Sequence, residues 1–161
     1  MKKQKLLSLD PSTIRTGASL FVGEKLAEAQ LIDMHKTAID NRIWTMCDAI
    51  ERYVDYTKPN LVVIEDIQLQ GNVQVFIRLA KLQGIIQRIL RKRNIPYVML
   101  TSSKWRRALG FKSGKGVKRE QLKQKAIDLV TEKYHIQYSE DVCESICIAM
   151  AYYKLKEQGE I

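Results

Sequence analysis

The chain has 161 residues, and its 45% apolar and 28% charged residues are typical of one folded globular domain rather than of a disordered segment. No run approaches the roughly 18 apolar residues of a membrane span, and the start MKKQKLLSLD lacks a signal-peptide pattern, so we expect a cytoplasmic protein without a membrane partner. Three cysteines without CxxC spacing disfavour a disulfide framework or a zinc site, while the formal net charge of +9 favours an anionic partner.

The first part of the chain predicts three consecutive strands. KLLSLD at 5–10 is a short apolar run, TGASLFV at 16–22 follows a turn, and LAEAQLIDM at 26–34 completes the series. Because the connections are short, we expect the three strands to pair antiparallel.

A helix should follow, capped by Asp40 and ended by Lys58 and Pro59. LVVIE at 61–65 is a continuous apolar run of strand length, which predicts a strand buried on both faces. Asn72 can cap a long second helix. The apolar stripe of that helix comprises Phe76, Leu79, Leu82, Ile86 and Ile89.

The last part of the chain predicts a strand, PYVMLT at 96–101, then a basic loop and helix over 103–133, and a final helix from Ser139 to Lys156. The order βββαβαβαα predicts one α/β domain over residues 1–161, with a five-stranded mixed sheet, three strands antiparallel and then two parallel, flanked by helices.

Positive charge is concentrated in residues 88–125, where 13 Lys and Arg stand against one acid, so this segment carries +12 and the rest of the chain −3. A charged run by itself usually marks a solvated face. Here Trp105, Phe111 and the glycine-rich GFKSGKG at 110–116 interrupt the basic residues, a pattern that suits the backbone and bases of a nucleic acid.

Four acids fall where the predicted fold would gather them. Asp10 ends the first strand and Glu65 the fourth, and these strands would place both carboxylates at one edge if they run parallel as neighbours. Asp141 and Glu144 are spaced i, i+3 and share one face at the start of the last helix. Such a cluster is best stabilised by divalent cations such as Mg²⁺, so the pattern predicts a metal site.

Each acid also has a simpler explanation when taken alone. Asp10 before Pro11 can start a turn, Glu65 can end a strand in solvent, and the acids after Ser139 can complement the helix dipole. The joint placement of all four favours the metal site.

Four segments together resemble the RuvC family of Holliday junction resolvases, within the RNase H-like superfamily, over nearly the whole chain. They are SLDPSTIRTGASLF, VVIEDI, LAKLQGIIQRIL and DVCESICIAMA. The resemblance implies an RNase H-like nuclease domain that resolves four-way junctions, and other branched DNA, by paired nicks leaving 5′-phosphate and 3′-hydroxyl ends. It also implies two Mg²⁺ ions per active site, with Mn²⁺ as a substitute, and no small-molecule cofactor.

The resemblance assigns the catalytic and metal-binding roles by position to Asp10, Glu65, Asp141 and Glu144. It places Lys104 and Lys118 beside the scissile phosphate, with Lys112 and Lys115 as competitors for the place of Lys118. The expected DNA-binding residues are Arg15, Lys104, Arg106, Arg107, Lys112, Lys115, Lys118 and Arg119.

Symmetric cutting needs two active sites, which implies a homodimer. The long helix carries more apolar residues than one face can hold, so we expect its interface at Phe76, Ile77, Ala80 and Gly84. Burial of all these residues in one thick core is the alternative.

Two features depart from the bacterial members of the family. Glu144 stands where they usually have aspartate, and the stretch 65–70 lacks an aromatic residue that could stack on bases. We therefore expect altered metal geometry and weak sequence selectivity. The small, divergent chain resembles phage-encoded members, which implies a bacterial cell or a phage-infected host.

Other functions remain open at this point. Another RNase H-like nuclease, acting on RNA–DNA hybrids or flaps, would use the same four acids. A non-catalytic junction-binding module is disfavoured because all four acids are present, and the two-domain ATPases that share the turn after Asp10 are disfavoured by the length of 161 residues.

Overall fold

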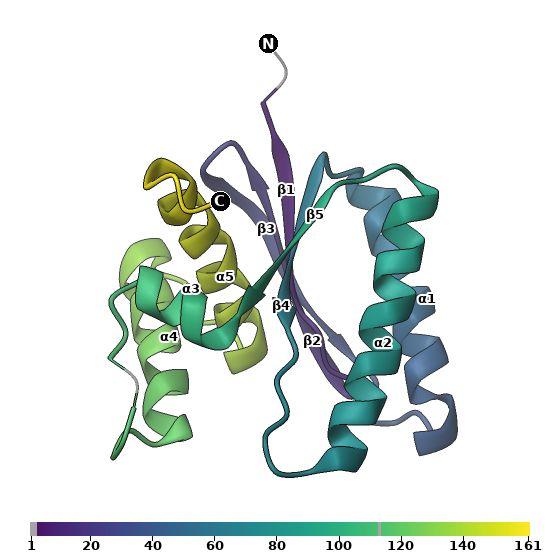
Figure 1. The fold of residues 1–161 in the computed structure, drawn as a ribbon. Coiled ribbons are helices and arrows are strands. Elements are labelled where there is room, and N and C mark those ends of the chain that lie inside the picture. Colours follow the sequence, from purple (N-terminus) through teal and green to yellow (C-terminus); the bar gives the residue numbers. More distant parts are fainter. Residues whose placement is uncertain (1–2, 113) are drawn as a thin grey trace.

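In the computed structural model, which describes residues 3–112 and 114–161, a five-stranded sheet lies between two layers of helices (Figure 1). The strands are β1 (Lys5–Asp10), β2 (Arg15–Val22), β3 (Lys25–Asp33), β4 (Leu61–Asp66) and β5 (Tyr97–Thr101). The helices are α1 (Arg42–Thr57), α2 (Val73–Lys92), α3 (Ser102–Ala108), α4 (Arg119–Tyr134) and α5 (Glu140–Glu157). Met1, Lys2 and Ser113, the last within the predicted glycine-rich loop, lie outside the described residues.

The sheet has the order β3-β2-β1-β4-β5, with β1 at its centre. The first three strands pair antiparallel, whereas β1, β4 and β5 run parallel. The predicted mixed sheet is therefore confirmed. Because β1 and β4 are parallel neighbours, their carboxyl ends meet at the same edge of the sheet.

The two faces of the sheet bury separate cores, and the alternation of side chains along each strand assigns them. Leu7 and Leu9 pack with α1 and α2 on one face, while Leu6 packs with α3, α4 and α5 on the other. The run at 61–64 in β4 alternates between the same two cores, which explains why it is apolar without interruption.

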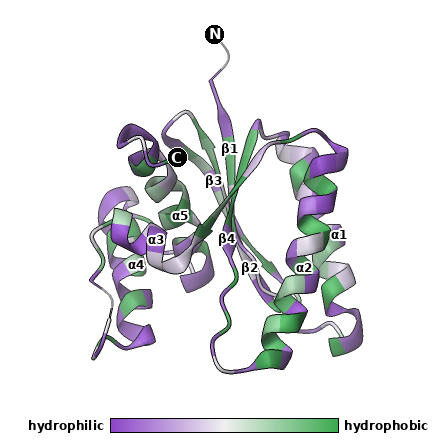
Figure 2. Cartoon of the chain, viewed as in Figure 1, coloured by the Kyte–Doolittle hydropathy of each residue, from purple (hydrophilic) through white to green (hydrophobic). Residues whose placement is uncertain are grey.

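Helix α5 is buried on almost every side, because it lies between the sheet and the layer of α3 and α4 (Figure 1). Its middle turns are correspondingly rich in apolar residues, whereas both of its ends are hydrophilic (Figure 2). The acids of its first turns lie at the edge where β1 and β4 end.

One helix start differs from its prediction, and another is confirmed. Ile39–Asn41 forms a short 3₁₀ turn, so α1 begins after Asn41 and the predicted cap at Asp40 is wrong. The carboxamide oxygen of Asn72 accepts hydrogen bonds from the backbone N–H groups of Gln74 and Val75, as a helix cap does.

The predicted basic loop and helix over 103–133 contains two helices rather than one. Ser102–Ala108 forms α3, and the hydroxyl of Thr101 caps it by accepting a hydrogen bond from the Lys104 N–H. Seven residues are too few for a helical period to stand out in a sequence.

The basic segment 88–125 is divided between two parts of the molecule. Its first residues lie at the end of α2, away from the edge where β1 and β4 end (Figure 1). There the Arg93 guanidinium pairs with Asp55 at 2.6 Å and with Glu51 at 2.8 Å, which ties α2 to α1. Only the residues from α3 onward lie near that edge of the sheet.

Within the two described ranges, no helix is both long enough and apolar enough to cross a membrane.

Candidate active site

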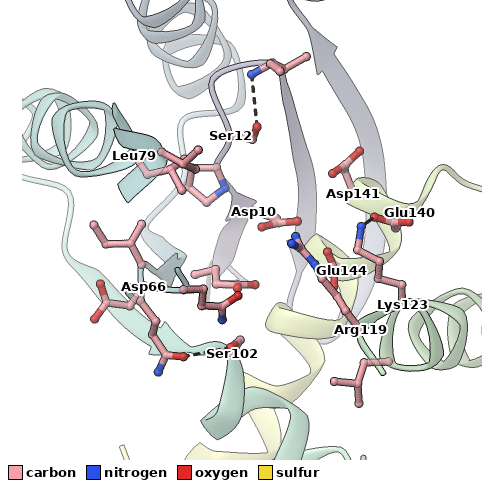
Figure 3. Close-up of a pocket in the computed structure, with 18 of the residues that line it drawn as sticks. Asp10, Ser12, Asp66, Leu79, Ser102, Arg119, Lys123, Glu140, Asp141 and Glu144 are labelled. Atoms are coloured by element: carbon pink, nitrogen blue, oxygen red, sulfur yellow. Dashed lines mark hydrogen bonds and ion pairs between the residues drawn. The ribbon is translucent and has the colours of Figure 1, made fainter. Parts of the chain in front are cut away.

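A cavity of about 530 Å³ opens at the edge of the sheet where β1 and β4 end (Figure 3). All four acids predicted to bind metal line it: Asp10, Glu65, Asp141 and Glu144. Basic side chains from α2, α3 and α4 line it as well: Arg78, Arg106, Arg119 and Lys123. Acids and bases that lie far apart in the sequence therefore share one cavity.

The strand register places Asp10 and Glu65 side by side. Asp10 follows Leu9 and Glu65 follows Ile64, and Leu9 and Ile64 are opposite each other where β1 and β4 pair. Leu9 and Ile64 pack against α1 and α2, so the next residue on each strand points to the opposite face, toward α5.

Gly17 allows α5 to bring the other two acids to the same place. It lies opposite Asp10 in β2, and a Cβ atom at Gly17 would be 1.8 Å from the backbone oxygen of Asp141. Only a residue without a side chain lets the start of α5 lie so close to the strand. The close contact delivers Asp141 and Glu144 to the cavity next to Asp10.

The cavity makes negative charge costly. Burial, followed by the charges of Glu65, Glu144 and Asp141, raises the pKa of Asp10 well above its usual range. Burial and the charge of Glu144 raise the pKa of Glu65 to about 7. The pKa of Asp141 is raised by burial and by the charges of Glu140 and Glu144. A cation in the cavity would relieve this repulsion.

Two neighbouring residues of α3 contact two of the acids. The indole N–H of Trp105 donates a hydrogen bond to Glu65 Oε2 at 3.1 Å, and Arg106 Nη2 pairs with Glu144 Oε1 at 3.2 Å. At the rim, Lys123 forms an ion pair with Glu140 (Figure 3). These residues supply the positive and polar partners that the acids have within the protein.

The donor chemistry of the four acids fits a hard divalent cation, because every potential ligand is a carboxylate oxygen. Across residues 3–112 and 114–161, however, no group of three or more Asp, Glu, His or Cys side chains is arranged to hold a metal ion. The ion pair with Arg106 occupies one oxygen of Glu144. The four acids have the donor atoms that such a metal prefers, but their side chains are not arranged in the geometry of a metal site.

The predicted DNA-binding residues fall into three groups. Arg106 and Arg119 line the cavity. Lys104 and Arg107 both contact Glu160, Lys104 through Nζ at 3.5 Å from its backbone oxygen and Arg107 through an ion pair at 2.8 Å. Lys112, Lys115 and Lys118 are exposed between α3 and α4, and Arg15 pairs with Asp33 at the start of β2. Like these four residues, Lys104 and Arg107 are not among the residues that line the cavity.

Three residues of the site were not predicted from the sequence. Arg78 reaches the cavity from α2, and Lys123 from α4. Lys123 is spaced i, i+4 from Arg119, which was an available signal that both share one helix face. No local sequence pattern indicates the contact of Trp105 with Glu65.

The residues predicted for a dimer interface lie within the first twelve residues of α2. Ile77 is exposed, Phe76 and Ala80 are partly buried, and a Cβ atom added at Gly84 would meet nothing within 4 Å among the described residues. The first turns of this helix are hydrophobic in Figure 2. This apolar face is not buried in the core.

Comparisons with known proteins point to one family. The family model of the crossover junction endodeoxyribonuclease RuvC matches residues 6–152. The RuvC of Nocardia farcinica is 29% identical over 111 residues, which cover 65% of this chain and 59% of that protein. The matching region therefore spans about three-fifths of the length of that curated relative.

Solved structures share the fold. Thermus thermophilus RuvC in complex with a Holliday junction substrate superposes with a TM-score of 0.77 at 10% identity, covering 97% of each chain. The fowlpox virus resolvase, in complex with substrate Holliday junction DNA, has a TM-score of 0.64 at 15% identity and covers 92% of this chain and 96% of its own.

Proposed function

Since the chain belongs to the RuvC family of crossover junction endodeoxyribonucleases and has its RNase H-like fold, we propose that it is a structure-selective DNA endonuclease. Its substrate is the four-way, or Holliday, junction, which it cuts by paired nicks that leave 5′-phosphate and 3′-hydroxyl ends. We also assign the protein to the cytoplasm of a bacterial cell or a phage-infected host, because the curated RuvC relatives are bacterial.

The observation that carries this proposal is the meeting of four carboxylates from β1, β4 and α5 in one cavity. The raised pKa values of Asp10, Glu65 and Asp141 mark the cavity as a place where added positive charge is strongly favoured.

We assign Asp10, Glu65, Asp141 and Glu144 as the residues that hold two Mg²⁺ ions, with Mn²⁺ as a substitute. When bound, the ions would activate a water molecule and stabilise the leaving 3′-oxygen of the cut strand. Asp10 would be the central residue of this site, because the charges of Glu65, Glu144 and Asp141 all act on its carboxylate. Glu144 would join the site from the second turn of α5.

The basic residues are assigned to the DNA backbone. Arg78, Arg106, Arg119 and Lys123 line the same cavity as the acids, so a phosphate held by them would lie next to the metal-binding oxygens. Lys104 and Lys118 are assigned to the surroundings of the scissile phosphate. The exposed Lys112 and Lys115 would contact the DNA arms beyond it.

Paired nicks require two active sites, and we assign the apolar face of α2 to a homodimer interface. Val73 and Ile77, one turn apart on this helix, are 53% and 39% exposed, which leaves apolar surface uncovered in the single chain. Phe76, Ala80 and Gly84 would complete the contact, with Gly84 allowing two helices to approach closely.

The segment after Glu65 argues for weak sequence selectivity. Gln68, Leu69 and Gln70 are exposed beside the cavity, and none has an aromatic ring that could stack on an unpaired base. We therefore expect recognition of the shape of the junction rather than of its bases.

The test compares labelled substrates of matched sequence: a four-way junction, a flap, a linear duplex and an RNA–DNA hybrid, each with Mg²⁺ or with EDTA. We expect paired nicks in the junction only when Mg²⁺ is present, at similar rates for several junction core sequences, with products that a ligase seals directly. A hybrid or a linear duplex cut as fast as the junction would contradict the proposal, as would one core sequence cut far faster than all others.

A further inference from the structure

Helix α3 is connected to the acid cluster through two consecutive side chains. Trp105 donates to Glu65 Oε2, and Arg106 pairs with Glu144 Oε1. The two also contact each other, since the Arg106 guanidinium lies 4.9 Å from the centre of the Trp105 ring. The acids of β4 and α5 are therefore linked through one cation and one indole.

The side chain of Arg106 is largely buried in this position, but one of its hydrogen-bond donors is not used. Its side chain is only 14% exposed, and that of Glu144 only 9%. The Nε atom of Arg106 is buried and has no hydrogen-bond partner within the part of the chain that the structure describes. A guanidinium that existed only to join α3 to α5 would be expected to use this donor as well.

We propose that Arg106 is the internal counter-cation of the acid cluster in the metal-free protein, and that Glu144 must exchange Arg106 for the metal when an ion binds. This inference rests on the proposed function, because it requires a metal site at the four acids. It also accounts for the finding that the acids, although gathered around one cavity, are not arranged to hold an ion.

The exchange has two physical consequences. The positive charge of Arg106 opposes the entry of a divalent cation and occupies an oxygen that the ion needs, so removal of this charge should strengthen metal binding. Once released by Glu144, the guanidinium remains next to the cavity with its full set of donors available. It can then bind a DNA phosphate, which would couple metal binding to the capture of DNA.

The alternative is that Arg106 is a structural bridge between α3 and α5. In that case its loss would lower stability and disorder the site, and metal would bind as weakly as before or more weakly. The sign of the change in metal affinity therefore separates the two roles.

The first experiment measures Mg²⁺ and Mn²⁺ binding calorimetrically without DNA, at pH 8, where the pKa of about 7 leaves Glu65 mostly ionised. The variants are Arg106→Gln, Arg106→Lys, Arg107→Gln and Asp10→Asn. Arg107→Gln removes the same charge from the same helix, but its guanidinium is 68% exposed and pairs with Glu160.

We expect Arg106→Gln to bind metal about fivefold more tightly or better, and both Arg106→Lys and Arg107→Gln to bind like the unmodified protein. Unchanged or weaker binding by Arg106→Gln, with the folded state intact by circular dichroism, overturns the inference. Asp10→Asn tests the metal site itself: if it binds metal as well as the unmodified protein does, the proposed function fails rather than the role of Arg106.

A second readout follows the guanidinium directly. Trp44, the other of the two tryptophans, is 63% exposed on α1, so Trp44→Phe leaves Trp105 as the single indole. Mg²⁺ should change the emission of Trp105 in this variant, because the cation above its ring moves. The change should be much smaller in Trp44→Phe combined with Arg106→Gln, and an equal change in both proteins would contradict the exchange.

Discussion

Gly17 shows how one residue controls the geometry of the acid cluster. Gly17 is opposite Asp10 in the sheet, and the start of α5 packs directly against it. We predict that Gly17→Ala destabilises the protein by about 2–3 kcal/mol or more, because its Cβ atom overlaps backbone atoms that cannot rotate away. Denaturant unfolding measures the stability, and calorimetry measures the accompanying loss of Mg²⁺ affinity.

Ser19→Ala provides the matched control. Ser19 lies two residues further along β2 on the same face, and its buried hydroxyl has no hydrogen-bond partner among the described residues. This change adds no atoms beneath α5, so stability and Mg²⁺ affinity should stay close to those of the unmodified protein. Equal behaviour of the two variants would show that close packing at Gly17 does not position the acids.

The raised pKa values predict an unusual pH dependence of stability in the metal-free protein. Glu65 has a pKa of about 7 in the folded state, against 4.5 for the ordinary group, so the folded chain holds a proton that the unfolded chain has already lost. The contribution of Glu65 to the free energy of unfolding is therefore full below pH 4.5, and this contribution is lost as the pH rises to about 7.

Thermal unfolding in EDTA should therefore show the melting temperature falling by a few degrees between pH 5 and pH 8. Glu65→Gln should make this slope shallower, and Mg²⁺ added at pH 8 should restore the lost stability by binding the folded state. A slope that is the same in Glu65→Gln as in the unmodified protein would contradict the pKa assigned to Glu65.

At the scale of elements, α2 connects the proposed dimer face to the edge of the sheet where β1 and β4 end. The buried side chain of Gln83 donates from Nε2 to the backbone oxygen of Glu65 at 2.7 Å. We predict that Gln83→Leu costs about 1–2 kcal/mol of stability and weakens Mg²⁺ binding, because the end of β4 loses its support. Gln87→Leu, which removes only a contact with Tyr97, should leave Mg²⁺ binding unchanged. A normal Mg²⁺ affinity in Gln83→Leu would contradict this link.

The elements differ in how far the sequence alone could predict them. The strands were predictable because the apolar pattern of KLLSLD and LVVIE reflects burial on both faces of a sheet. The start of α1 was not, because Asp40 and Asn41 are both good caps and the choice between them depends on a 3₁₀ turn. Helix α3 is too short to show a helical period of apolar residues in the sequence, and it depends on its packing against the rest of the molecule.

The same distinction holds for the site. The meeting of Asp10, Glu65 and the acids of α5 could be predicted, because the parallel order of β1 and β4 requires the first two to share an edge. The contacts of Trp105 and Arg106 could not, because they depend on how α3 lies against α5. Residue type and spacing predict which acids meet, whereas tertiary packing determines the side chains that contact them.

At the scale of the whole molecule, the apolar face of α2 makes a prediction about assembly. Ile77→Glu should convert a homodimer into a monomer without loss of folding, because Ile77 is 39% exposed in the single chain. Light scattering at micromolar concentration, with and without junction DNA, measures the mass. Paired cutting of one junction should give way to single nicks.

Ile136→Glu introduces the same charge at another exposed isoleucine, 47% exposed between α4 and α5. This control should leave the mass and the paired cutting unchanged. An unmodified protein that remains monomeric in the presence of junction DNA would exclude the proposed interface.

We propose that the cavity at the ends of β1 and β4 is a metal-dependent nuclease site that acts on DNA junctions. The most direct measurement follows binding and cleavage of one labelled four-way junction by the unmodified protein and by Asp10→Asn, with Mg²⁺ and with EDTA. We expect paired nicks only for the unmodified protein with Mg²⁺, while Asp10→Asn binds the junction and leaves it intact. Cleavage by Asp10→Asn at the rate of the unmodified protein, or cleavage in EDTA, would contradict it.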